Sequence, residues 1–447
     1  MRKKFTQKLK FIVFFSILHS TFLSSHSLFA SDKLIIISPH RKSIQEEFIP
    51  KFREYYKNAF KKEVEVDWLD QGGTADDIRF VSAKYAKNPK SSGIDVFWGG
   101  GTSAFIQIDE EGYLDKYELP KNLKGEIPEK VAGIDLYSKN RTWYGSALSS
   151  FGIFFNKMVL KIEKLQEPQL WADLGAAQYI DNVSQTDPRR SGTATTLNHI
   201  ILQSLGWEKG WELLLRLGGN TKMFTHSSSD PIKAVVAGNA AISLAIDFYA
   251  LPKVDELGAN KLGFVMPKGQ TILDSDPIAI LKGAPNRIVA ERFVDFVLNK
   301  DTQKLLVLPK GTDQGPRQSA LGRMAVNTKT YLETEGKRSS AFNPFTETQY
   351  LKYDTEKAST TRNILSDLVG VMVIDTHREL KTAWKTIIKN GMKESDLIEL
   401  SKMPLTEKEF EQLSAKWDNE VLRNKTINEW VKFAHKKYAA LGGKAEG

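Results

Sequence analysis

The chain has 447 residues, of which 41% are hydrophobic. This length exceeds what a single hydrophobic core usually organises, so we expect two or three domains. The net charge is +9, and five basic residues without any acid lie in the first ten positions, so the rest of the chain carries +4. The other basic residues are interleaved with acidic ones. This pattern argues against nucleic-acid binding and suits anionic ligands. The absence of cysteine excludes disulfides, thiolate metal sites and a cysteine nucleophile.

Residues 1–30 have the pattern of a signal peptide. Basic residues precede the apolar run Phe11–Leu18, and small and polar residues lead to Ala30. The apolar run is shorter than the ~20 residues that a membrane-spanning helix needs. We therefore expect cleavage after Ala30, a mature chain that begins at Ser31, and, since no lipid-attachment cysteine is present, a location in the periplasm of a diderm bacterium.

Short apolar runs alternate with amphipathic stretches in the next hundred residues, which is typical of βα units. Three buried strands are predicted, and each runs into a small or polar loop that opens a helix: Leu34–Ile37, Val64–Trp68 and Ile94–Trp98. Because loops at the carboxyl ends of parallel strands share one edge of the sheet, we expect a ligand to bind there.

The stretch Trp143–Asn156 is predicted to cross into a second lobe. Residues 171–264 repeat the βα pattern, and Gly263–Pro267 and Pro277–Leu281 are the predicted return crossing. The helix predicted over Arg287–Val297 then belongs to the first lobe. From Asn343 onward the chain is polar with helical spacing, which indicates a helical C-terminal extension.

Several segments resemble ABC-importer solute-binding proteins of the ferric-iron, organophosphate and polyamine type. They include "GIDVFWGGG" at 93, "DPRRSGTATT" at 187, "FTHSSSDPIKAVVAGNAAISLAIDFYA" at 224, "SDPIAILKGAPN" at 275 and "AERFVDFVLNKDTQKLL" at 290. The resemblance covers about residues 31–340. It implies two α/β lobes, joined by two crossing strands, that close over a ligand.

The predicted fold class is therefore α/β: a two-lobed, type II-like periplasmic-binding-protein fold plus a helical C-terminal extension. The predicted boundaries are 1–30 for the signal peptide, 31–145 and 265–342 for the first lobe, 146–264 for the second lobe and 343–447 for the extension.

The turn Ser191-Gly192-Thr193 is the strongest candidate for binding an anion. It opens a predicted helix, so it offers backbone N–H groups and two hydroxyls at the positive end of a helix dipole. The resemblance implies that this loop holds an anion, although simple capping by Ser191 would produce the same sequence. Arg189 is either a bidentate ligand for phosphate or carboxylate or an ordinary surface charge.

Other candidates lie in the remaining loops expected at the cleft. The glycine-rich turns either cradle ligand oxygens or only allow a tight turn from strand to helix, and neither is a P-loop because no Gly-Lys-Ser/Thr follows. Ser227 either binds the ligand or caps the next helix. These candidates are His40, Gly73, Thr74, Gly100, Thr102, Ser103 and Ser227.

Asp247-Phe248-Tyr249 ends a predicted strand where, as the resemblance implies, ferric-binding relatives carry two adjacent iron-ligating tyrosines. Phe248 replaces one of them, so no metal is predicted; Tyr249, Asp247 and His40 are the ligands if iron is bound. Asp247 alternatively binds a sugar hydroxyl or an amine, or caps the strand end. Trp98 and Trp143 either stack on a sugar ring or belong to the core.

We predict a periplasmic substrate-binding component of an ABC transporter that closes over a small phosphorylated or carboxylated anion and docks on an inner-membrane permease. Ferric iron is the alternative, with a sugar or polyamine third. We expect a monomer that needs no cofactor and binds no nucleic acid. An exported sensor or interaction module is the alternative of another class. No Gly-x-Ser-x-Gly, His-Glu-x-x-His or histidine cluster indicates an enzyme.

Overall fold

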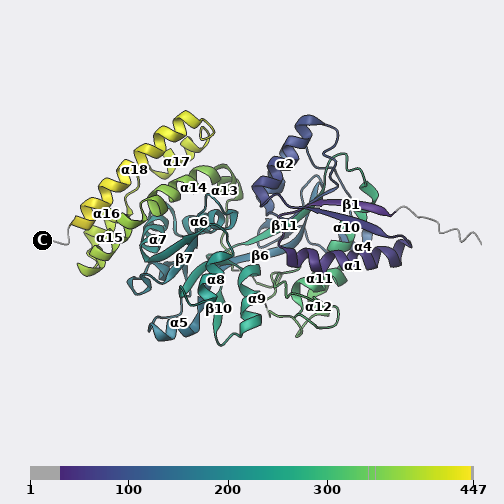
Figure 1. Ribbon diagram of the computed structural model, residues 1–447, viewed down its shortest axis with the longest axis horizontal. Coiled ribbons are helices and arrows are strands. Elements are labelled where there is room, and N and C mark those ends of the chain that lie inside the picture. Colours follow the sequence, from purple (N-terminus) through teal and green to yellow (C-terminus); the bar gives the residue numbers. More distant parts are fainter. Residues whose placement is uncertain (1–30, 341, 348, 444–447) are drawn as a thin grey trace, which may run out of the picture.

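The computed structural model describes residues 31–340, 342–347 and 349–443. The predicted signal peptide, residues 1–30, lies outside these ranges and stays a prediction. Figure 1 shows two lobes side by side, with the C-terminal helices on the outer side of one of them. In the described ranges, no helix has the length and apolar character needed to cross a membrane.

The first lobe is built on parallel strands. The strand order is β2 (Val64–Leu69), β1 (Asp32–Ile37) and β3 (Val96–Trp98), so the three predicted strands are confirmed with small shifts at their ends. The helices that follow these strands are α1 (Lys42–Phe60), α2 (Thr74–Lys87) and α3 (Thr102–Glu110). The lobe also contains α4 (Lys121–Lys124), β4 (Lys130–Val131), β5 (Ile134–Asp135), α10 (Arg287–Leu298), α11 (Lys300–Val307) and α12 (Thr328–Glu333).

Two long antiparallel strands connect the lobes. The strand β6 (Trp143–Asn156) is buried throughout, has the predicted bounds, and pairs first with β11 (Leu273–Ile280) and then with β9 (Ile242–Ile246). The strand β11 also pairs with β3. The strand β10 (Leu262–Val265) pairs with the second-lobe half of β6, so β11 makes the return crossing.

The second lobe continues the same nine-stranded sheet through β9, β7 (Val183–Thr186) and β8 (Thr221–Thr225), which are parallel to one another. Its helices are α5 (Lys157–Ile162), α6 (Gly192–Leu205), α7 (Trp207–Asn220), α8 (Asp230–Val236) and α9 (Asp247–Leu257), with 3₁₀ turns at Trp171–Gly175 and Ala177–Tyr179. The two-lobed α/β fold is therefore confirmed, whereas the lobe boundaries given above stay a prediction.

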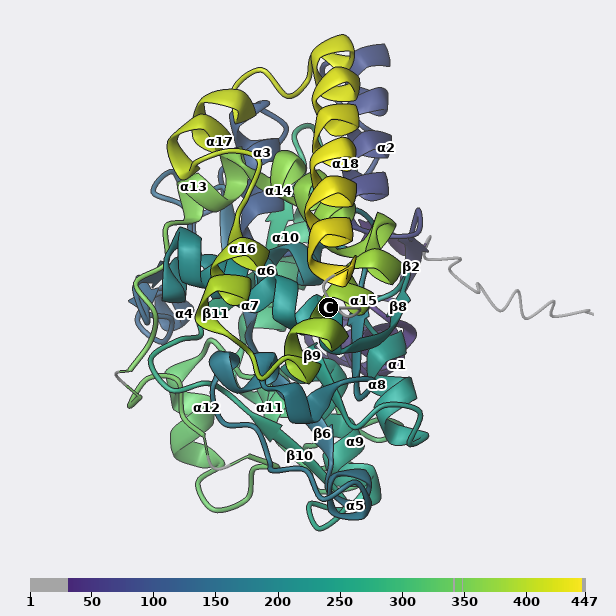
Figure 2. The same cartoon turned by 90° about the vertical axis from the view of Figure 1, so that its left-hand side faces the viewer.

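The C-terminal extension is helical, as expected. It contains α13 (Thr355–Thr360), α14 (Arg362–Val369), a π-helical segment (Gly370–Asp375), α15 (His377–Lys389), α16 (Glu394–Ser401), α17 (Glu407–Ser414) and α18 (Glu420–Gly442). Side chains cap several of these helices; Thr406 and Glu409 form a capping box at α17. In Figure 2 the helices α15 and α18 lie across the outer face of the second lobe.

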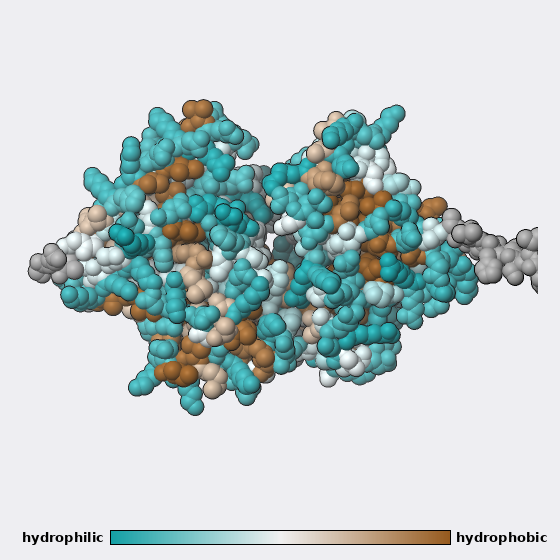
Figure 3. Space-filling model, viewed as in Figure 1, coloured by the Kyte–Doolittle hydropathy of each residue, from teal (hydrophilic) through white to brown (hydrophobic). Residues whose placement is uncertain are grey.

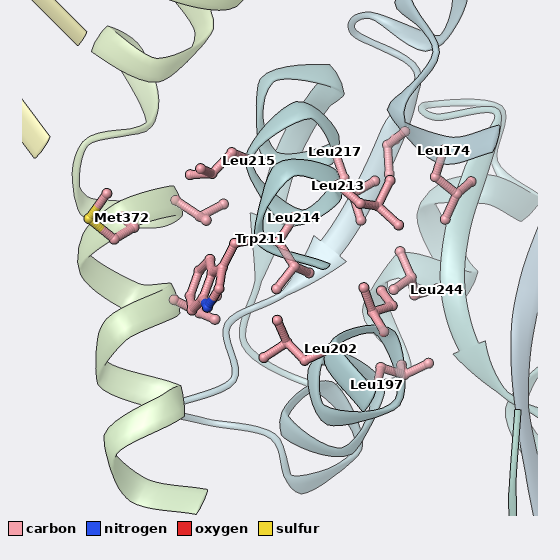
Figure 4. Packing of buried hydrophobic residues seen from close by; sticks show 14 of the residues in the cluster. Leu174, Leu197, Leu202, Trp211, Leu213, Leu214, Leu215, Leu217, Leu244 and Met372 are labelled. Carbon is pink, nitrogen blue, oxygen red and sulfur yellow. The ribbon is translucent and has the colours of Figure 1, made fainter. Parts of the chain in front are cut away.

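The extension shares the hydrophobic core of the second lobe. Trp384 is fully buried against α7, where a Cβ at Gly219 would lie 2.5 Å from the indole Cδ1. Its Nε1–H donates to Asn220 Oδ1 at 2.8 Å. Figure 4 shows Met372, on the extension, beside Trp211 of α7. The extension is therefore part of the folded lobe rather than an appendage on its surface.

Residues 349–354 form a third connection between the lobes. Tyr350 packs against the hydrophobic core of the first lobe, whereas the next residue, Leu351, packs against that of the second. The Leu351 N–H donates to the carbonyl of Thr271, just before the crossing strand β11. The start of the extension therefore passes from one lobe to the other beside the crossing strand β11.

Candidate functional site

A cleft with a volume of about 700 Å³ lies between the lobes. A hollow separates the two halves of the face in Figure 3. The lining comes from the loops at the carboxyl ends of the strands, from β11 and from α14. The predicted candidates that line it are His40, Gly73, Thr74, Gly100, Ser103, Arg189, Ser191, Gly192, Thr193, Ser227 and Tyr249.

The turn Ser191-Gly192-Thr193 forms the N-terminus of α6 at the cleft. The hydroxyl of Ser191 accepts the N–H of Ala194 at 3.2 Å, so the capping role is observed. Gly192 and Thr193 are the first two residues of the helix, and their N–H groups therefore have no acceptor within it. The turn thus caps its helix and still presents two backbone donors at the positive end of the helix dipole.

The matching turn of the first lobe already holds an anion of the protein itself. Gly100 and Gly101 donate their N–H groups to Asp276 Oδ1 at 2.8 and 3.4 Å. Both have a positive φ, 110° and 85°, which favours glycine. Gly100 lines the cleft as expected, but its N–H is engaged by a carboxylate from β11, 176 residues further along the chain.

Asp276 is also paired with His40 and Arg323. His40 Nε2–H donates to Asp276 Oδ2 at 2.7 Å and Nδ1 accepts from the Ser38 hydroxyl at 3.0 Å, a tautomer that satisfies both contacts. Burial lowers the pKa of His40, so the ring is neutral at pH 7. Burial raises the pKa of Asp276, but Arg323 and His40 together hold it well below its usual range. His40 therefore orients a carboxylate at the floor of the cleft.

Arg41 lies in the cleft, and no ion pair involves it in the described part of the chain. It is partly buried, it donates to the carbonyl of Leu321 at 3.1 Å, and its Nε has no hydrogen-bond partner among the described residues. Burial and the charge of Arg323 lower its pKa to about 10. The ring of Tyr249 lies 5.6 Å from its guanidinium carbon. A partly buried cation without a counter-ion favours an anion as its neighbour.

Arg189 lines the cleft, but its guanidinium is already paired. It donates to both carboxylate oxygens of Asp187 and, at 2.9 Å each, to both oxygens of Asp375 in the extension. These bonds raise its pKa above the usual arginine range. The bidentate fork predicted to bind the ligand binds two carboxylates of the chain instead.

Two predicted candidates do not line the cleft. Asp247 is buried behind it and accepts the N–H and the hydroxyl of Ser150 at 2.8 and 3.0 Å. Burial raises its pKa to about 7. The hydroxyl of Thr102 donates to Asp274 Oδ1 at 2.8 Å and faces a separate cavity of about 160 Å³. Thr102 and Asp247 are thus engaged by Asp274 and Ser150, and their expected ligand roles stay predictions.

The residues suggested for iron are not assembled around one point. Asp247 is engaged with Ser150, His40 is engaged with Asp276, and Tyr249 lies beside the positive charge of Arg41. Among the described residues, no group of three or more histidine or carboxylate side chains is arranged to hold a metal ion.

The two tryptophans suggested for sugar stacking are buried. Trp98 packs between His40 and Phe293, and its Nε1–H donates to Ser146 at 2.8 Å. Trp143 is only 4% exposed. Both therefore belong to the core of the first lobe.

The sequence matches the family of bacterial extracellular solute-binding proteins over residues 91–316, just over half of the chain. The chain belongs to this family. Members bind small ligands and deliver them to an ABC permease, are usually periplasmic and are not enzymes.

Two curated proteins are recognisably related in sequence. An uncharacterised protein of Haemophilus influenzae is 28% identical over 249 residues, 55% of this chain and 68% of that protein. The phosphoglycerate transport regulatory protein PgtC of Salmonella typhimurium is 26% identical over 160 residues, 36% of this chain and 39% of its own length. The match thus spans well under half of PgtC.

Solved structures share the fold at low sequence identity. The periplasmic binding protein P5PA is 21% identical with a TM-score of 0.59 and covers 75% of this chain and 98% of its own. AfuA from Actinobacillus pleuropneumoniae, solved with fructose-6-phosphate bound, is 22% identical with a TM-score of 0.58, and the match covers 80% of this chain and 98% of AfuA. Iron-bound HitA from Pseudomonas aeruginosa is 17% identical with a TM-score of 0.56, and the match covers 76% of this chain and 99% of HitA.

Several cleft residues of this solute-binding protein were missed in the sequence. Asp274 and Asp276 alternate along β11, so their side chains share one face of the strand, and this spacing is the signal that was available. Burial raises the pKa of Asp274 to about 6. Arg41, Arg323 and Arg362 had no comparable signal, because only the folded chain brings them to the cleft.

Proposed function

We propose that the cleft captures a small anion, a phosphorylated or carboxylated metabolite, in the periplasm for import through the ABC permease. The observation that carries the proposal is an excess of positive charge in the cleft. Seven arginines line it, and four of them pair with carboxylates. Within the described ranges, no ion pair involves the other three, which are Arg41, Arg190 and Arg362.

The N-terminus of α6 supports the same ligand class. Its two unpaired N–H groups and the hydroxyl of Thr193 face the cleft where the helix dipole favours negative charge. The sugar phosphate in AfuA and the phosphoglycerate in the name of PgtC are ligands of this class. The acidic side chains at the floor, Asp274 and Asp276, would accept hydrogen bonds from hydroxyl groups of such a ligand.

The test begins with native mass spectrometry of the purified protein to find a co-purified ligand. Calorimetric titration with inorganic phosphate, glycerol 3-phosphate and citrate follows. Ser191→Ala removes a hydroxyl at the anion site and should weaken binding about tenfold to hundredfold. Because it removes only a helix cap from the fold, it should lower the free energy of unfolding by about 1 kcal/mol.

Thr406→Ala is the matched control, because it removes a helix cap on α17, away from the cleft. It should lower the free energy of unfolding by a similar amount and leave the affinity unchanged. A wild-type protein that binds none of the three anions, or a Ser191→Ala variant that binds as wild type does, would contradict the proposal.

The periplasmic location rests on cleavage of residues 1–30, which we propose from their pattern alone. N-terminal sequencing of the protein from its native cell should give a chain that begins at or near Ser31. An intact Met1 on protein from the cytosol would overturn both the cleavage and the location.

A further inference from the structure

The C-terminal extension reaches into the ligand cleft with one arginine. Arg362 is the first residue of α14, and its side chain lines the cleft between the two lobes. On the second lobe, its Nη2 lies 2.6 Å from the position that a Cβ at Gly192 would take. On the first lobe, its Nη1 lies 3.5 Å from the hydroxyl of Ser103. The guanidinium therefore covers the turn at the N-terminus of α6.

The charge of Arg362 is not balanced by an ion pair. No carboxylate lies within ion-pair distance of it in the described ranges, although the side chain is partly buried. Burial lowers its pKa, and Tyr353 and Asp274 act in the opposite direction. A partly buried guanidinium that faces a cleft and two backbone donors is stabilised when an anion binds beside it.

Other contacts of the extension hold this arginine in place. Asp375, six residues beyond the end of α14, accepts both arms of the Arg189 fork. The hydroxyls of Ser366 and Thr195 lie 3.1 Å apart, which joins α14 to α6. These contacts tie the extension to the same loop and helix that carry Ser191 and Gly192. The position of Arg362 relative to the turn is thus fixed by two independent anchors.

We propose that the extension forms part of the ligand site, with Arg362 binding the same anionic group as the N-terminus of α6. This inference rests on the proposed function, since it concerns the same anion. The planar fork of Arg362 and the N–H groups of Gly192 and Thr193 approach from different directions, which suits a phosphate with several oxygens or a carboxylate with two. Arg362 has the role that the sequence suggested for Arg189, and Arg189 anchors the extension.

The position between Gly192 and Ser103 also relates the arginine to closure of the lobes. An anion held by α6 and Arg362 would lie beside the N-terminal turn of α3, which carries Ser103. Ligand binding and contact between the lobes therefore involve the same guanidinium. Removing it should weaken binding without unfolding the protein, because the hydrophobic core of the extension does not include its side chain.

The test is calorimetric titration of the full chain with inorganic phosphate and glycerol 3-phosphate. Arg362→Gln should weaken the binding of both about tenfold to hundredfold, and Arg362→Lys should recover part of the loss through its charge. Arg378→Gln is the control, because it removes one positive charge from an exposed position of α15 outside the cleft lining. Its affinity and melting temperature should match wild type.

The outcomes separate the two proposals. If wild type binds these anions and Arg362→Gln binds them equally well, the extension is not part of the site and the proposed function stands. If Arg362→Gln lowers the melting temperature but keeps wild-type affinity, the residue is structural and the inference fails. If wild type binds neither anion nor citrate, the proposed function fails and this inference fails with it.

Discussion

The N-terminus of α6 in the second lobe and that of α3 in the first resemble each other in sequence and differ in what their N–H groups bind. Both follow a strand, contain glycine and face the cleft. At α3 the donors of Gly100 and Gly101 meet Asp276. At α6 the described residues show no such carboxylate at Gly192, and the atom nearest to a Cβ added there belongs to Arg362, a cation.

This difference shows that a turn capable of binding an anion is not yet a ligand site. Backbone donors at a buried helix end need an acceptor, and the protein can provide one itself. The first lobe uses Asp276 from β11 as an internal anion. In the second lobe, we propose that the donors of the α6 turn bind the ligand. Three experiments test this comparison: removal of the internal carboxylate, substitution of a glycine in each turn, and a change of pH.

Asp276→Ala should destabilise the protein most. It leaves the buried Arg323 without its partner and removes the acceptor of two backbone N–H groups, a loss of about 3–5 kcal/mol in the free energy of unfolding. Urea denaturation measures this loss of stability. Sulfate should restore more stability to this variant than to wild type, because the vacated turn of α3 then resembles that of α6.

Asp76→Ala is the control for that substitution. It breaks the exposed pair of Asp76 with Arg79 at the rim of the cleft, which contributes less than about 1 kcal/mol. An Asp276→Ala variant as stable as this control, with no response to sulfate, would show that the carboxylate does not occupy the turn as an internal anion.

Gly100→Ala and Gly192→Ala should separate stability from binding. At Gly100, φ is 110° and the new Cβ would lie 2.6 Å from Thr74, so we expect a loss of about 1–3 kcal/mol of stability. At Gly192 the new Cβ would meet only the guanidinium end of Arg362, which can rotate about its side-chain bonds while α14 stays anchored, so the fold should tolerate it. Its cost should appear in calorimetry as weaker anion binding, because the guanidinium is displaced. Equal losses of stability in both variants would contradict this distinction.

The smallest expected effect is a pH dependence through Asp274. Because burial raises its pKa to about 6, the carboxyl is ionised at neutral pH and repels an anion in the cleft. Protonation as the pH falls through 6 removes this repulsion, so the affinity for sulfate, whose charge is constant in this range, should rise several-fold toward pH 5.

The decisive measurement is the difference between wild type and Asp274→Asn. His226 also lines the cleft, so the pH dependence of wild type alone does not identify the group. A titration of affinity against pH that is equally steep in both proteins would assign the effect to groups other than Asp274.

The sequence predicted the secondary-structure elements far better than the contacts between distant side chains. Strands β1 to β3, the crossing strand Trp143–Asn156 and the cap at Ser191 follow from hydrophobic spacing and local hydrogen bonding, which act within a few residues. The family resemblance then supplied the arrangement of the lobes.

Three contacts between side chains and distant parts of the chain could not be predicted from such local patterns. Asp276 binds a turn 176 residues away, Arg189 binds a carboxylate 186 residues away, and Arg362 reaches a loop about as distant. Each depends on tertiary packing, so a local pattern shows that a donor or a charge is present and not what it binds. For this reason the sequence did not show that the guanidinium of Arg189 is engaged by Asp187 and Asp375.

The third connection between the lobes limits how they can rotate. Tyr350 and Leu351 are adjacent, with α-carbons about 3.8 Å apart, yet each packs against a different lobe. When two rigid bodies turn relative to each other, only points on the rotation axis stay at rest. For the predicted closure of the lobes, the peptide between these residues, held at Thr271, must therefore lie close to that axis, or one of the two contacts must break.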